Sequence, residues 1–102
     1  MGKPFAAMFH ASLKRRHEVA IMYFGRTSEF LLATSERMAI PGEACTLEQL
    51  LSRLRLRGGR WADELDGRHV LCTVNGKAAA LSDRIEAGGE IAISSRKSVF
   101  EA

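Results

Sequence analysis

The clearest signal for the fold is the stretch TLEQLLSRLRLRGG, residues 46–59. Thr46 and Gln49 have the spacing of a capping box, in which each side chain satisfies a backbone amide of the other residue at the start of a helix. The leucines recur at intervals of three and four residues, which places Leu47, Leu50, Leu51 and Leu54 on one face. Glycine readily adopts the left-handed conformation that ends many helices, so Gly58-Gly59 is the expected stop. We predict one amphipathic helix here.

Two strands are predicted before this helix. Residues 18–24, EVAIMYF, are rich in β-branched and aromatic types, which favours a strand buried on both faces. The segment 27–33 is a short connection that is either helical or looped. Residues 34–40 form a second strand with polar residues at alternate positions, and Pro41-Gly42 ends it.

Three further strands are predicted after the helix, and the first two of them form a hairpin. Trp61 and Leu65 are four positions apart, which suits one more helical turn. Residues 68–74 alternate as a strand, and Asn75-Gly76 is a strong signal for a type I′ hairpin turn into a short strand at 77–81. Residues 81–85 form a turn or a brief 3₁₀ piece, and residues 90–93 form the last strand.

This order of elements predicts an α+β fold, in which a mixed sheet of four to five strands packs on one main helix. The right-handed crossover rule lets the strand after the helix lie parallel to the first strand. This is the β-grasp, or ubiquitin-like, architecture. We divide the chain into a basic, flexible arm at 1–16, a β-grasp domain at 17–95 and a polar tail at 96–102. An organelle-targeting segment or a misassigned start is the alternative for the arm.

Composition and charge restrict the classes of function. The 102 residues carry a formal charge of +3. Residues 1–16 contain four basic side chains and no acid, so the remainder is nearly neutral. The one local basic cluster, between Arg53 and Arg60, lacks the interleaved aromatic residues that stack on bases, so we predict no nucleic-acid binding. No apolar run approaches the roughly 18–20 residues that span a bilayer, so we predict no membrane segment.

The cysteines and histidines predict no metal or catalytic site. Cys45 and Cys72 form no C-x-x-C pair and have no histidine at ligand spacing, so zinc is not expected. They are predicted to be half-buried apolar residues in a reducing cytoplasm. The three histidines are scattered, and no nucleophile motif accompanies them. We therefore predict no cofactor and no enzymatic activity.

Five segments, in the same order, resemble those of the small sulfur-carrier subunit of molybdopterin synthase (MoaD) and, more distantly, of the thiamine sulfur carrier ThiS. The first two segments are an opening strand with its turn, at 19–26, and the start of the helix, at 46–51. The others are an R-W-A segment at 60–62, an L-x-x-x-V-N segment at 70–76, and the final turn and strand at 88–93. Together they are spread over about 75 residues, from Val19 to Ile93.

The resemblance implies a reaction at the C-terminus. In this family a partner enzyme adenylates the last carboxylate of a Gly-Gly tail with ATP, and sulfur then replaces AMP to give a thiocarboxylate. The resemblance implies an adenylating enzyme or the synthase large subunit as protein partner, and Ala102 as the reactive end. The sequence given ends SSRKSVFEA, with Phe100 and Glu101 where the family has bare backbone. We therefore expect a non-catalytic binding or accessory module, with a functioning sulfur carrier as the alternative.

The resemblance also implies a docking surface, because the family binds its partners through apolar residues on the exposed sheet face. Phe24 matches one such position and fits a core position equally well. Ser94 stands where the family tends to be aromatic, and Val99 and Phe100 are candidate contacts in the tail. Ile91 and Ile93 are expected to be scaffold or contact residues.

Overall fold

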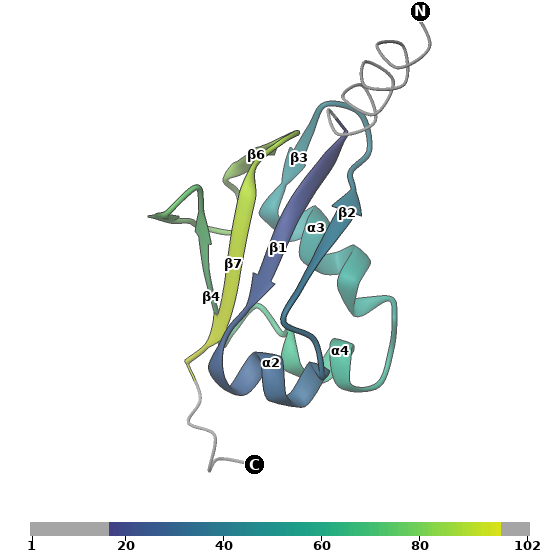
Figure 1. Ribbon diagram of the computed structural model, residues 1–102, viewed down its shortest axis with the longest axis vertical. Helices are drawn as coiled ribbons and strands as arrows, with labels where there is room; N and C mark the ends of the chain where they lie inside the picture. Colours follow the sequence, from purple (N-terminus) through teal and green to yellow (C-terminus); the bar gives the residue numbers. More distant parts are fainter. Residues whose placement is uncertain (1–16, 97–102) are drawn as a thin grey trace, which may run out of the picture.

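The computed structural model describes residues 17–96. Its strands are β1 (Glu18–Tyr23), β2 (Ser35–Ala39), β3 (Ala44–Thr46), β4 (Val70–Val74), β5 (Lys77–Ala78), β6 (Arg84–Glu86) and β7 (Glu90–Ser95), and its helices are α2 (Gly25–Leu31), α3 (Leu47–Arg55) and α4 (Arg60–Glu64). Five strands form the main sheet in the order β2-β1-β7-β4-β5, and β3 pairs with β6 in a smaller sheet (Figure 1). The predicted mixed sheet of four to five strands is confirmed.

One core joins the main sheet to α3. The four leucines predicted to share a face of this helix are at most 1% exposed. Alternate residues of β1 and β7 pack against them, and Ile21 and Ile93 are both 0% exposed. The capping box is also confirmed, since the Thr46 hydroxyl accepts from the Gln49 amide at 3.1 Å and the Gln49 side chain accepts from the Thr46 amide at 2.8 Å. The sheet therefore packs on one main helix, as the β-grasp prediction requires.

Two expectations about the first strand are wrong. β1 is buried on one face only, because α3 covers one side of the sheet and residues such as Met22 on the other side are half-buried. Its parallel neighbour is β7, whereas β4, the strand after the helices, pairs with β7 in the antiparallel sense. β7 thus fills the position between β1 and β4, where both of its own edges are paired.

The remaining differences between the predicted and the observed elements lie in short segments. The expected turn at 81–85 contains the start of β6, which pairs with β3 through Cys45 and Ile85. The expected strand at 77–81 is only two residues long, and the connection at 27–33 is mostly helical. Asn75 and Gly76 have φ values of 52° and 84°, as the type I′ turn requires. Strands of two or three residues carry no periodicity, so only their pairing partners identify them.

Glu36 links the sheet edge to the segment between α3 and α4. Its carboxylate accepts one hydrogen bond from the Tyr23 hydroxyl at 2.7 Å and two from the Arg57 guanidinium at 2.7 and 2.9 Å. The same guanidinium lies 4.4 Å from the centre of the Trp61 ring, which meets Tyr23 edge to face at 5.6 Å. The Arg57 hydrogen bonds hold the pKa of Glu36 below its ordinary value, although partial burial opposes them.

This network predicts a dependence of stability on pH. Because the pKa of Glu36 is lower in the folded state, its stabilisation is present above the ordinary glutamate value of 4.5 and is lost as the pH falls through the folded value. We expect a loss of at most about 1 kcal/mol, since the Arg57 side chain is 38% exposed and water screens the pair. Urea unfolding of the wild type and Glu36→Gln from about pH 7 to about pH 3 measures it. Equal losses in both proteins would contradict the expectation.

Candidate partner-binding face and polar cleft

The main sheet has one open face. α3 lies behind β1 and β2 in Figure 1, and the described helices leave the other face uncovered near the middle of the sheet. Directly paired residues of neighbouring strands point to the same side. The register therefore places Met22 of β1, Ala92 of β7 and Thr73 of β4 in one row across the open face. Ala92 and Thr73 are small, so the exposed large side chains toward one end of the face stand out.

Phe24, Ser94 and Leu71 gather at one end of the open face, and we call them the end patch. Phe24 follows the buried Tyr23, is 50% exposed, and donates its amide to the Ile93 carbonyl at 3.0 Å. Ser94 is half-buried and pairs directly with Leu71, which is 44% exposed. The structure thus places Phe24 outside the core and next to the strand that carries Ser94.

The other predicted site residues divide into two groups. Ile91 and Ile93 are 0% exposed, so they belong to the core of the scaffold and not to its surface. Val99, Phe100 and Ala102 lie outside the described residues. Leu71 was missed, although its position between the inward-facing Val70 and Cys72 already points it outward.

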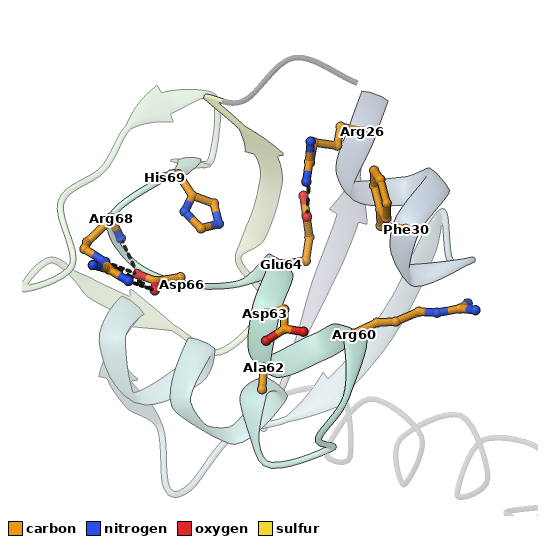
Figure 2. Close-up of a pocket in the computed structure, with 9 residues that line it drawn as sticks. All are labelled: Arg26, Phe30, Arg60, Ala62, Asp63, Glu64, Asp66, Arg68 and His69. Carbon is orange, nitrogen blue, oxygen red and sulfur yellow. Dashed lines mark hydrogen bonds and ion pairs between the residues drawn. The ribbon is translucent and has the colours of Figure 1, made fainter. Parts of the chain in front are cut away.

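A polar cleft of about 500 Å³ opens at the same end of the sheet, between α2, α4 and the segment that leads into β4 (Figure 2). A buried ion pair forms part of its wall, with Arg26 Nε 3.3 Å from Glu64 Oε1. The Thr27 hydroxyl donates to the other Glu64 oxygen at 3.1 Å. The Arg26 guanidinium also lies 4.4 Å from the centre of the Phe30 ring. Glu64 is therefore fully engaged in holding α4 against α2.

The chain leaves the end of β7 next to His69, which lines the cleft. Arg96 follows β7 and donates its amide to the His69 carbonyl at 2.8 Å. In the part of the chain that the structure describes, the buried His69 Nε2 has no hydrogen-bond partner. Beside it, hydrogen bonds from Arg68 lower the pKa of Asp66. Three arginines and three acids line the cleft, so their formal charges cancel. The net charge of the lining therefore favours neither anions nor cations.

The described residues contain no metal-ligating cluster, and their two cysteines are not activated as thiolates. No group of three or more potential metal-ligating side chains occurs among residues 17–96. Both cysteines are free thiols and are buried, more fully than the half-burial predicted for them. Burial raises the pKa of Cys72 to about 11 and that of Cys45 above its ordinary value, so both stay protonated near neutral pH.

Three arginines of the basic cluster expected on the helix form ion pairs or hydrogen bonds within the protein. Arg55 pairs with Glu48, Arg57 pairs with Glu36, and Arg53 donates to the Ala39 carbonyl at 3.1 Å. Engaged guanidinium groups are poorly placed to follow a phosphate backbone. Within residues 17–96, no helix is long and apolar enough to cross a bilayer.

Comparison with known proteins gives matches in structure only. No protein-family model and no curated protein sequence matches the chain. A Pyrococcus furiosus protein assigned as molybdopterin converting factor, subunit 1, aligns with a TM-score of 0.65 at 16% identity and covers 78% of this chain and 98% of its own. The solution structure of the HVO 2177 protein of Haloferax volcanii aligns with a TM-score of 0.67 at 17% identity, over 79% of this chain and 84% of its own.

A further similar structure is closer in sequence. The small archaeal modifier protein SAMP1 of Haloferax volcanii aligns with a TM-score of 0.58 at 26% identity, and the match covers 74% of this chain and 91% of the other. These likenesses show that the fold is the ubiquitin-like β-grasp of MoaD/ThiS type, in agreement with the resemblance found in the sequence.

Proposed function

We propose that this protein is a non-catalytic binding module that docks on a protein partner through the end patch. The observation that carries this proposal is the exposure of Phe24 and Leu71, at 50% and 44%, on either side of Ser94 on the uncovered sheet face. Burying such side chains contributes about 25 cal/mol for each Å² of apolar area removed from water. Aromatic side chains near the centre of an interface often carry much of the affinity, so Phe24 is the main contact.

The proposed partner is an adenylating enzyme or the large subunit of molybdopterin synthase from the same organism. The names of two similar structures, a molybdopterin converting factor subunit and a small archaeal modifier protein, support this choice. We propose a cytoplasmic location, which the two free thiols support. The proposal involves no cofactor, nucleic acid or membrane.

A binding measurement tests the end patch. The full chain would be titrated by calorimetry into the adenylating enzyme and into the synthase large subunit encoded in its own genome. We expect Phe24→Asp to weaken binding about 30-fold, because a hot-spot residue contributes roughly 2 kcal/mol and aspartate cannot be buried without cost. Leu71→Asp should act in the same direction.

Leu56→Asp is the matched control, since Leu56 is 85% exposed just beyond α3, outside the end patch. It should leave affinity unchanged. The proposal fails if neither enzyme binds the wild type, or if the Phe24 and Leu56 variants bind equally well.

The second candidate is a sulfur carrier. The match over 98% of the converting factor subunit and the 26% identity to the modifier protein favour it. A terminal carboxylate oxygen would attack the α-phosphorus of ATP with loss of pyrophosphate, and a sulfide would then attack the acyl carbon with loss of AMP. In this candidate the carboxylate of Ala102 reacts.

Intact mass spectrometry separates the two candidates. The full chain would be incubated with the adenylating enzyme, magnesium ATP and sulfide, beside a chain shortened by residues 100–102. Exchange of one oxygen for sulfur at Ala102, absent from the shortened chain, supports the carrier. An unchanged mass together with intact binding supports the non-catalytic module.

A further inference from the structure

The outer edge of β2 carries backbone groups that the sheet leaves unused. The Tyr23 amide donates to the Thr34 carbonyl, and the Ile40 amide donates to the His17 carbonyl. These two backbone bonds show which residue pairs of the β1–β2 ladder are hydrogen-bonded and which are not. In the register of the two strands, every second pair is hydrogen-bonded, so the backbone groups of Glu36 and Met38 also bond to β1. The N–H and C=O groups of the alternate residues Ser35, Arg37 and Ala39 therefore point away from the sheet.

One of these outward groups has a partner within residues 17–96. Arg53 of α3 reaches across and donates to the Ala39 carbonyl at 3.1 Å. This contact places the exposed Arg53 side chain beside the edge, and Figure 1 shows β2 as the outermost strand with α3 behind it. The opposite edge strand, β5, has only two residues. β2 is thus the longer of the two edges, with a helix alongside it.

The charge of the β2 edge is positive. Arg37 is exposed on the strand, while Arg53 and Arg57 approach it from the helix side. The one acid of the strand, Glu36, is held by two hydrogen bonds from Arg57 and by the Tyr23 hydroxyl. With Glu18 of β1, which pairs directly with Ala39, three arginines stand against two glutamates and leave one net positive charge beside the row of available backbone groups.

We infer that the β2 edge binds an extended acidic peptide from a protein partner as an additional strand of the sheet. Backbone hydrogen bonds to Ser35, to Arg37 and to the Ala39 amide would provide the pairing, since Arg53 already occupies the Ala39 carbonyl. Acidic side chains of the peptide would meet Arg37 on the open face and Arg53 on the helix side, where the Arg53 guanidinium keeps N–H donors besides the one it gives to Ala39. Alternate apolar side chains would contact the half-buried Met38. This surface is separate from the end patch.

A second copy of the chain fits the edge less well. Two β2 strands paired antiparallel about Arg37 would place like charges directly opposite each other, which is destabilising. Charged residues on an edge commonly prevent such self-pairing. The same arginines that oppose self-pairing therefore select a strand of opposite charge.

A random-peptide phage library, with peptides of about twelve residues, tests the inference with the full chain as bait. We expect enrichment of peptides in which Asp or Glu accompanies alternating Val, Ile or Thr. The affinity of a synthetic copy of the most enriched peptide should fall about tenfold on Arg37→Glu and on Arg53→Glu, because each change replaces attraction with repulsion. Arg84→Glu, at a 71% exposed position on β6, makes the same charge change and should have no effect.

Amide hydrogen exchange identifies the mode of binding. Strand addition should protect the amides of Ser35, Arg37 and Ala39, while those of Glu36 and Met38, already bonded to β1, should be protected with or without peptide. The inference is overturned if no peptide is enriched, if the enriched peptides lack acids, or if these three amides stay unprotected. Phe24→Asp should leave peptide binding unchanged, so failure here is distinct from failure of the end patch.

Discussion

Glu64→Ala should lower the free energy of unfolding by about 3–5 kcal/mol, because it removes the carboxylate that neutralises a buried guanidinium. The Arg26 and Glu64 side chains are only 8% and 5% exposed, so water screens their attraction weakly. The substitution also removes the acceptor of the buried Thr27 hydroxyl. A domain of this size is typically stable by about 5–15 kcal/mol, so the loss would be a large share of the total.

Urea unfolding at neutral pH measures this change. Glu48→Ala is the matched control, since its ion pair with Arg55 is on the surface, with side chains 43% and 27% exposed. It should cost less than about 1 kcal/mol. Similar losses in the two variants would show that the Arg26–Glu64 pair is no more important than a surface pair.

Leu54→Ala should cost about 2–5 kcal/mol, because it removes buried methyl groups and leaves a cavity between α3 and the sheet. Leu54 is 0% exposed, whereas Leu56, two residues later, is 85% exposed. Leu56→Ala is therefore a control with the same chemical change and should alter stability by less than about 0.5 kcal/mol.

Thermal unfolding followed by circular dichroism compares the two leucine variants. For a domain of this length, each kcal/mol corresponds to about 4–8 °C in Tm. The midpoint of Leu54→Ala should therefore fall well below that of Leu56→Ala. Overlapping transitions would mean that the core packing around α3 contributes little to the fold.

The main helix and the fold class could be predicted because their signals are local. The capping box at Thr46 and the spacing of the leucines depend only on near neighbours along the chain. The pairing of β3 with β6 could not be predicted, since Cys45 and Ile85 are far apart in the sequence and each strand has three residues. The position of β7 beside β1 is likewise a long-range property.

The candidate site was less predictable than the fold. Phe24 ends an apolar run, and the sequence does not tell whether the strand continues inward or the chain turns away; the turn into α2 at Gly25 leaves Phe24 half exposed. The Arg26–Glu64 pair joins residues 38 positions apart. In the sequence, these two charges are indistinguishable from surface charges.

The place of β7 determines the order in which the sheet can assemble. β7 is the last described strand along the chain and the middle strand of the sheet, and it lies between β1 and β4. As the chain is synthesised from its N-terminus, residues 17–89 emerge before the strand that joins the two halves. Until Glu90–Ser95 inserts, β1 and β4 each expose an edge with unsatisfied backbone groups, which is a risk for aggregation. Completion of the sheet is therefore a late, long-range step in folding, and its rate depends on the closing of the chain between β1 and β7.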